Sequence, residues 1–125
     1  MISHLEKPHK KEDLLSVLHP YVKEWFFKTF KEFSLPQLYG VLEIHNKNNI
    51  LISAPTGGTK TLTSTLAIIN ELVILADKKQ LKDKVYCIYC NPLRALSRDI
   101  EFNLQKPLEE IKKIAKKHGK DLEIR

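Results

Sequence analysis

The stretch from Asn49 to Thr61 has the residue types and spacing of a phosphate-binding loop, and it reads N-I-L-I-S-A-P-T-G-G-T-K-T. An apolar run rich in β-forming residues breaks at Ala54-Pro55, and a loop of small residues leads to Lys60. Backbone N–H groups at the start of a following helix would be unpaired there and could bind an anion, helped by the helix dipole. The Lys60 ammonium would reach the terminal phosphates, and the Thr61 hydroxyl would ligate the accompanying Mg²⁺.

The loop differs from the generic pattern G-x-x-x-x-G-K-[ST] at two positions, where Ala54 and Thr59 replace glycine. Thr59 is the larger change, because a β-branched side chain restricts the backbone where it must wrap phosphate closely. Gly57 and Gly58 keep the loop flexible, but one position early. From the loop alone, two interpretations stay open: nucleotide binding, and a glycine-rich turn that holds no ligand.

The elements that must position this loop alternate between strands and helices. Periodicity predicts strands at 49–53, 85–89 and 121–125, and helices at 12–18, 21–33, 35–44, 61–79, 95–104 and 107–118. Strand, helix, strand, helix, strand is the order of an α/β domain with a parallel sheet and right-handed crossovers. Ligands of such sheets bind at the carboxyl ends of the strands, where this chain places 54–60 and 91–94.

Length and composition limit what the chain can do. With 125 residues, 42% hydrophobic and 29% charged, it is at most one modest domain and is short for a complete nucleotide-driven motor. The N-terminus lacks the apolar core of a signal peptide, and Asn70-Glu71 interrupts the most apolar helix, so we predict a cytoplasmic protein without a membrane segment. The net charge of +6 is compatible with nucleic-acid binding but is also common in proteins that bind none.

Aromatic and basic residues each allow two interpretations. Trp25, Phe26, Phe30 and Phe33 could stack on bases, but their helical spacing favours packing in a core. The lysine-rich stretch 112–120 could meet phosphates, but its pattern favours a solvated helix face.

The cysteines and histidines show no ligand pattern. Cys87 and Cys90 form a C-x-x-C on or just past a predicted strand, where residues three apart point to opposite faces, and no second pair completes a zinc site. We therefore expect buried structural cysteines. The five histidines have no ligand spacing with one another or with the cysteines, and we assign them no role.

The acidic residues that phosphate hydrolysis needs do not follow the loop. In this class of loop, an acidic residue after a later strand holds the magnesium ion and positions water. No Asp-Glu pair follows an apolar strand before Arg125. As written, the chain carries half of an ATPase site.

The order of three motifs resembles the opening of a superfamily 2 (DEAD/DEAH-type) helicase, most like the N-terminal part of the large helicase-related (Lhr) type. The motifs are Phe33 with Pro36-Gln37, the segment 50–61, and the segment 91–96. The loop motif of the family reads A-P-T-G-S-G-K-T, and the corresponding segment of this chain reads A-P-T-G-G-T-K-T. The next family motif, S-P-L-[KR]-A-L followed shortly by Asp, is matched by N-P-L-R-A-L and then Asp99. Three motifs in order are more specific than any one of them, and the similarity runs from about Trp25 onward.

The resemblance implies a fold and a domain division. The fold would be a three-layer P-loop (RecA-like) domain with a parallel sheet, incomplete at its C-terminal side. Residues 1–20 would be a flexible or helical N-terminal extension, and residues 21–125 the front part of the first RecA-like, ATP-binding domain.

The resemblance also implies roles for matched residues, with ATP and Mg²⁺ as cofactors. Gln37 would hydrogen-bond the adenine edge, with Phe33 near the ring. The triphosphate would be held by Thr56, Gly57, Gly58, Thr59, Lys60 and Thr61. A single strand of DNA or RNA would lie along Pro92, Leu93, Arg94, Ala95 and Leu96. Arg94 would make a sequence-independent phosphate contact.

Two features separate this chain from the family pattern: Gly58-Thr59 replaces serine-glycine, and the residues stop before a DExH motif and a second RecA-like domain. We therefore predict the N-terminal part of an ATP-dependent helicase that needs the remaining domains, in the same or a separate chain, for hydrolysis and unwinding. Its sheet edges would favour self-association. Two alternatives stay open: a non-catalytic nucleic-acid-binding remnant that has lost ATP turnover, and a small α/β domain for a different phosphorylated ligand.

Overall fold

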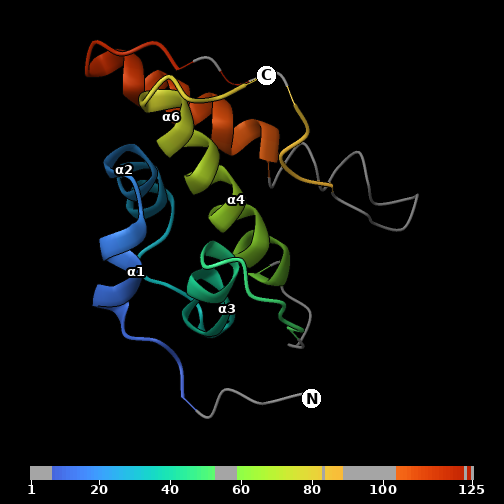
Figure 1. Cartoon of the computed structure of the whole chain (residues 1–125). Helices are drawn as coiled ribbons and strands as arrows, with labels where there is room; N and C mark the ends of the chain where they lie inside the picture. Colours follow the sequence, from blue (N-terminus) through green and yellow to red (C-terminus); the bar gives the residue numbers. More distant parts are fainter. Residues whose placement is uncertain (1–6, 53–58, 83, 89–103, 123, 125) are drawn as a thin grey trace, which may run out of the picture.

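A computed structural model of the chain describes residues 7–52, 59–82, 84–88, 104–122 and 124, with the side chains of the long central helix described from Leu62 onward. Its helices are α1 (Lys11–Val17), α2 (Pro20–Thr29), α3 (Leu35–His45), α4 (Thr59–Asp77) and α6 (Lys106–Lys117). In Figure 1, α4 runs through the middle of the molecule, with α3 beside its N-terminal part and α6 crossing near its C-terminal end. The helix that follows the predicted phosphate loop packs against α3 and α2, while α6 packs on α2 and α1 on α3.

Helix boundaries follow the proline and capping signals of the sequence. Pro20 is the first residue of α2, and the Nδ1 atom of His19 accepts a hydrogen bond from the Tyr21 N–H at 3.1 Å. Ser34 precedes α3, which has a proline in its first turn. Beyond the end of α6, Gly119 has a φ of 77°, a left-handed conformation that favours glycine. These features confirm the predicted starts of α2 and α3, but α2 ends at Thr29 and not at position 33, because Phe30 already has an extended backbone.

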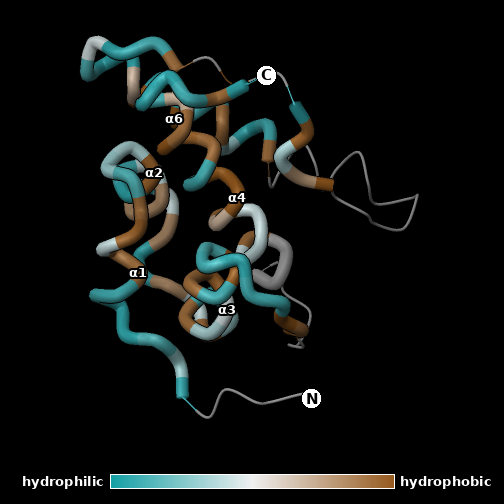
Figure 2. Tube along the Cα trace, in the orientation of Figure 1, coloured by the Kyte–Doolittle hydropathy of each residue, from teal (hydrophilic) through white to brown (hydrophobic). Residues whose placement is uncertain are grey.

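The core is built from the apolar faces of all five helices, as the hydropathy colouring of Figure 2 shows along α4 and α6. Phe26 is fully buried, and its ring lies 4.8 Å from that of Phe33 in a stacked arrangement. Trp25 is 4% exposed, and its Nε1–H donates to Glu110 of α6. The prediction that these aromatic residues pack a core is therefore confirmed, with Phe30 at the rim.

The predicted N-terminal extension packs into the same core. Leu14 of α1 is fully buried and Leu18 is 4% exposed. Asn70 of α4 is 1% exposed, its Oδ1 accepts from the His19 N–H at 2.7 Å, and its Nδ2 donates to the Val17 carbonyl at 2.9 Å. One buried side chain thus fixes the link between α1 and α2 to the middle helix.

The predicted parallel sheet stays a prediction. Among the described residues, 49–52, 84–88, 121–122 and 124 carry no strand pairing. Large apolar side chains in two of these segments are exposed, Leu51 at 93%, Val85 at 76% and Ile88 at 82%. Cys87 is exposed too, so the expectation that it is buried was wrong; its segment runs outside the packed helices (Figure 1).

No helix in the described part of the chain combines the length and apolarity needed to cross a lipid bilayer.

Candidate functional site

The predicted site residues divide into three groups by what the structure describes. Phe33 and Gln37 are described with their side chains. Residues 59–61 are described as the helical backbone of the first turn of α4. The remaining predicted positions lie outside the described residues: Thr56, Gly57, Gly58, Pro92, Leu93, Arg94, Ala95 and Leu96.

Gln37 is buried in the first turn of α3 and held in a fixed orientation. It is 2% exposed, and its Oε1 accepts a hydrogen bond from the backbone N–H of Ser34 at 2.8 Å. This is the side-chain-to-backbone contact of a helix capping box, which satisfies an N–H that the helix cannot satisfy itself. This hydrogen bond and the burial of the side chain fix the rotamer of Gln37.

Phe33 anchors the start of α3. It is 7% exposed, and besides stacking on Phe26 its ring meets that of Phe27 edge-on at 5.5 Å. Aromatic pairs of this geometry contribute about 0.5–1.5 kcal/mol each beyond the area they bury. Because Phe33 is next to Ser34, the aromatic cluster fixes the turn from which Gln37 is presented.

The loop itself is flanked by two described residues that meet α3. Ile52 is the last described residue before the loop, and Thr63 lies one turn inside α4. A Cβ atom on Gly40 of α3 would stand 2.7 Å from Ile52 Cδ1 and 2.8 Å from Thr63 Cγ2. The helix that carries Gln37 therefore contacts both ends of the predicted phosphate loop.

The sequence predicted that the helix after the loop starts at Thr61, and the observed start lies two residues earlier. The helix begins at Thr59, so the backbone of Lys60 and Thr61 forms its first turn, and that turn carries no acidic residue. Such a turn presents unpaired N–H groups and the positive end of the helix dipole. A first turn of this kind is a place where a phosphate group can bind.

Histidines that the sequence left without a role make polar links between elements. Histidine Nε2 atoms meet carboxylate oxygens between His9 and Glu43 at 3.0 Å, His19 and Asp77 at 3.0 Å, and His118 and Glu24 at 3.2 Å. The pairs are separated by 34, 58 and 94 residues, so no local spacing could have indicated them. Within the described residues, no group of three or more His, Cys, Asp or Glu side chains could hold a metal ion.

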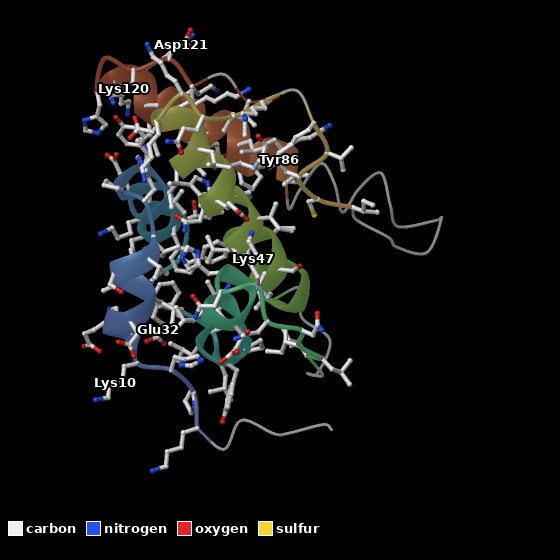
Figure 3. The ribbon with its side chains drawn as sticks, in the orientation of Figure 1. Lys10, Glu32, Lys47, Tyr86, Lys120 and Asp121 are labelled. Carbon is white, nitrogen blue, oxygen red and sulfur yellow. The ribbon has the colours of Figure 1, made fainter. Side chains whose placement is uncertain are left out.

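Asp77, the last residue of α4, makes one of these histidine contacts and a second hydrogen bond with a lysine. It accepts hydrogen bonds from Lys120 at 2.8 Å and from His19 at 3.0 Å. Figure 3 shows Lys120 beyond the C-terminal end of α6. The Lys120 hydrogen bond, followed by that of His19, holds the pKa of the Asp77 carboxyl below its ordinary value.

Acid should destabilise the protein through Asp77. Its lowered pKa means that the carboxylate adds stability above its unfolded-state pKa of about 4, and this stability is lost as the pH falls through the lower folded-state pKa. The Glu43 carboxylate should also lose its stabilising effect in acid, because hydrogen bonds from Asn48, and to a smaller extent from His9, lower its pKa. Urea unfolding between pH 6 and about pH 2 should show a shallower acid loss for Asp77→Asn than for wild type. The exposed Asp13→Asn is the control, and parallel curves for the two variants would contradict the assignment.

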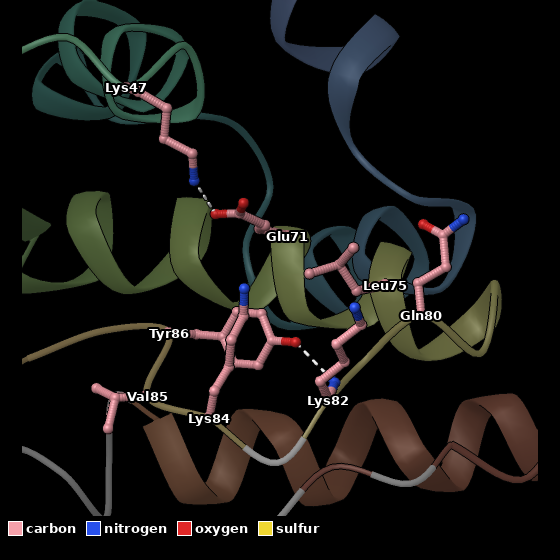
Figure 4. Close-up of a pocket in the computed structure, with 8 residues that line it drawn as sticks. All are labelled: Lys47, Glu71, Leu75, Gln80, Lys82, Lys84, Val85 and Tyr86. Carbon is pink, nitrogen blue, oxygen red and sulfur yellow. Dashed lines mark hydrogen bonds and ion pairs between the residues drawn. The ribbon is translucent and has the colours of Figure 1, made fainter.

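An open hollow lies beside α4. It encloses about 640 Å³ and is lined by Lys47, Glu71, Leu75, Gln80, Lys82, Lys84, Val85 and Tyr86. Figure 4 shows the Lys47–Glu71 ion pair along one side and the Tyr86 hydroxyl accepting from the Lys82 N–H at 2.7 Å. Phe33 and Gln37, the two predicted site residues that are described with their side chains, do not line this hollow.

Comparison with known families identifies the class of the protein. The sequence profile of the DEAD/DEAH box helicase family matches residues 35–124, a span that includes α3, the loop and α4. The chain belongs to the DEAD/DEAH box helicase family. No solved structure gives a significant match.

The individual relatives that are similar in sequence include Lhr-type helicases. The ATP-dependent helicase Lhr-Core of Methanothermobacter thermautotrophicus is 50% identical over 125 residues, which cover 100% of this chain and 14% of the relative. The ATP-dependent helicase Lhr-Core protein 2 of Thermococcus barophilus is 47% identical over 100% of this chain and 15% of its own length. The Lhr helicase/uracil glycosylase of Escherichia coli is 28% identical over 91% of this chain and 8% of its own length. The resemblance found in the motifs is confirmed, and the chain spans about one seventh of the first two relatives.

Proposed function

We propose that this chain is the N-terminal part of an ATP-dependent nucleic-acid helicase. The observation that carries the proposal is the start of α4 at Thr59, directly after A-P-T-G-G, with the buried Gln37 on the helix that packs against it. Family membership and relatives that are ATP-dependent helicases support it. The proposal includes a RecA-like, three-layer fold with a parallel sheet of residues 49–53, 85–89 and 121–125, incomplete at its C-terminal side.

We assign the cofactor ATP, with Mg²⁺, to the loop. Thr56 to Thr61 hold the triphosphate, Lys60 pairs with its terminal phosphates, and the Thr61 hydroxyl ligates the magnesium ion. Gln37 recognises the adenine edge, and Phe33 supports it from the aromatic cluster beside the ring. When bound, the nucleotide supplies the free energy that a helicase spends on moving a strand.

We assign single-stranded nucleic acid, DNA or RNA, to residues 92–96. In a parallel sheet these residues follow the second strand at the same edge as the phosphate loop, so a bound strand and ATP would be neighbours. Arg94 contacts the phosphate backbone without reading sequence. Because the chain spans 14% of an Lhr-Core relative, we assign hydrolysis and unwinding to its assembly with the remaining helicase domains.

Thr59 favours a second candidate, a nucleic-acid-binding remnant that has lost ATP turnover. Its β-branched side chain stands where the family motif has glycine. Two titrations distinguish the candidates, one of the chain with ATP and Mg²⁺ and one with a single-stranded oligonucleotide. Binding of ATP, tested by competition with other phosphorylated ligands, supports the helicase part. Binding of the oligonucleotide by a chain that does not bind ATP supports the remnant.

Thr59→Gly should strengthen ATP binding if the loop is a weakened phosphate site. Glycine frees the backbone to approach the phosphates, and a gain of about 1.4 kcal/mol would appear as a tenfold lower Kd in calorimetric titration. Thr29→Gly, at the last residue of α2, controls for losing a threonine elsewhere. Identical titration curves for Thr59→Gly and wild type would remove Thr59 as the weakening feature.

A further inference from the structure

His19 occupies the junction between the start of α2 and the end of α4. Its backbone N–H donates to the buried Asn70 at 2.7 Å, so the residue is tied to the body of α4. Its side chain is 10% exposed and makes one contact at each ring nitrogen. Nδ1 accepts a hydrogen bond from the Tyr21 N–H at 3.1 Å, and Nε2 lies 3.0 Å from an oxygen of the Asp77 carboxylate. A single imidazole therefore joins two helix ends.

These two contacts determine which ring nitrogen of His19 carries the proton. Nδ1 is unprotonated while it accepts from the Tyr21 N–H, because an imidazole nitrogen that carries hydrogen is a donor. The proton of the neutral ring is then on Nε2, where it is donated to Asp77. The neutral imidazole thus satisfies both partners at once.

The contact at Nδ1 is the N-cap of α2. Pro20 is the first residue of the helix and has no N–H, so the N–H of Tyr21 is the first that needs a partner outside the helix. Oxygen atoms of Ser, Thr, Asp or Asn side chains usually accept this hydrogen bond, and none of them changes charge between about pH 5 and 8. A histidine at this position makes the cap depend on a proton.

The geometry points to a pH-dependent switch at the start of α2, in which uptake of a proton by His19 exchanges the cap of α2 for a charged pair with Asp77. The added proton binds Nδ1, because Nε2 already carries one. The new Nδ1–H then faces the Tyr21 N–H, and two donors cannot form a hydrogen bond with each other. At Nε2 the ring is now cationic, so its hydrogen bond to the Asp77 carboxylate is charge-assisted and stronger.

The charged and titratable groups that face His19 act on this switch in opposite directions. Within the described part of the chain they are Asp77 at the end of α4, Lys120 beyond α6, and Tyr21, whose ring centre lies 4.7 Å from that of His19. The Asp77 carboxylate favours the cation, whereas Lys120 and the positive end of the α2 dipole oppose it. Because Lys120 and then His19 lower the pKa of Asp77, the carboxylate stays ionised over the range in which histidines titrate. Protonation of His19 therefore changes the contacts at the junction more than the stability of the whole protein.

Tyr21 carries the change from α2 towards α6. Its ring stacks on that of His118, just beyond the end of α6, with the ring centres 5.4 Å apart. The backbone of His19 stays bonded to Asn70 in both states, so the loss of the cap falls on Tyr21 and the first turn of α2. The start of α2 and its contact with His118 thus respond to pH, while the link between His19 and α4 holds.

The test is the hydrogen-exchange protection of the Tyr21 amide at about pH 8 and about pH 5, with each rate divided by the intrinsic rate at that pH. We expect the protection in wild type to fall about tenfold in acid, the fold-change that corresponds to an N-cap of ordinary strength. Over the same range the ring-nitrogen resonances of His19 should pass from those of the Nε2–H tautomer to those of the doubly protonated ring.

Three variants show whether the His19 ring is the cause. His19→Asn keeps a capping side chain that does not titrate, so the protection of Tyr21 should be the same at both pH values. Asp77→Asn removes the carboxylate that favours the cation, so the fall in protection should occur at a lower pH than in wild type. His9→Asn is the matched control, because it removes the histidine of another histidine–carboxylate pair, with Glu43 of α3, and it should behave like wild type.

The wild-type measurement decides the proposal even if a variant fails to fold. Equal protection of the Tyr21 amide at the two pH values would overturn it. So would a His19 ring that stays neutral at the lower pH, or a neutral ring with its proton on Nδ1. A fall in protection that persists in His19→Asn would assign the effect to another group, such as His118, and would overturn the proposal as well.

Discussion

Replacing Lys60 by alanine is expected to weaken ATP binding by about ten- to a hundredfold. A hydrogen bond between a charged amine and phosphate contributes about 1.5–3 kcal/mol, and the loss of this amount from the binding free energy gives that range. The helical backbone from Thr59 onward places Lys60 in the first turn of α4, beside the N–H groups that we propose bind phosphate. Calorimetric titration with ATP and Mg²⁺ measures the change.

Binding of a single strand should survive the same substitution, because residues 92–96 and not the loop are assigned to the strand. Lys78→Ala is the matched control, since it removes the same charge from an exposed position just past the other end of α4. It should leave ATP binding at the wild-type level. If Lys60→Ala and Lys78→Ala bind ATP equally well, the loop is a turn without a ligand.

Local signals in the sequence were sufficient for the helices in the described part of the chain, whereas the helix predicted at 95–104 lies outside the described residues up to position 103. Pro20 and the Ser34-to-Gln37 pattern act within one turn of chain, so they determine where α2 and α3 begin whatever packs around them. The start of α4 was predicted at Thr61 and is observed at Thr59. Spacing also predicted the buried Trp25 and Phe26, because they belong to a set of aromatic residues that recurs with helical periodicity and forms an apolar face.

The contacts between elements could not be predicted in the same way. The close packing at Gly40 depends on Ile52 and Thr63, which lie in different parts of the chain, and nothing in the residues around Gly40 indicates it. The histidine–carboxylate pairs join residues up to 94 positions apart. Periodicity is a property of neighbouring residues, so it orients a face but does not say which partner the face meets.

The parallel sheet illustrates a different limit. Residues 49–52 and 84–88 have the composition of strands, yet their apolar side chains Leu51, Val85 and Ile88 are exposed in the described structure. A strand needs a hydrogen-bonded neighbour, and a parallel neighbour is always distant in sequence. The strand prediction therefore depends on pairings that composition cannot supply, and it stays part of the proposal.

Replacing Asn70 by alanine is expected to cost about 2 to 4 kcal/mol of the free energy of unfolding. The substitution leaves the His19 N–H and the Val17 carbonyl without the partner they have now, and each unsatisfied buried group costs about 1–3 kcal/mol. Trp25 is the single tryptophan and is 4% exposed, so its fluorescence reports unfolding in urea. The exposed Asn49→Ala should change stability by no more than about 0.5 kcal/mol. Equal unfolding midpoints for the two variants would show that Asn70 does not anchor the link between α1 and α2.

The Asn70 anchor and the proposed nucleotide site should act independently, although both belong to α4. Asn70 lies three turns from Thr59, and the contacts it makes are with the chain between α1 and α2 rather than with α3. A ligand that binds only the folded state adds about 2.7 kcal/mol at a hundred times its Kd. ATP should therefore raise the stability of wild type and Asn70→Ala by the same amount. A smaller increment in Asn70→Ala would mean that the anchor reaches the loop through the helix, and that the N-terminal segment takes part in nucleotide binding.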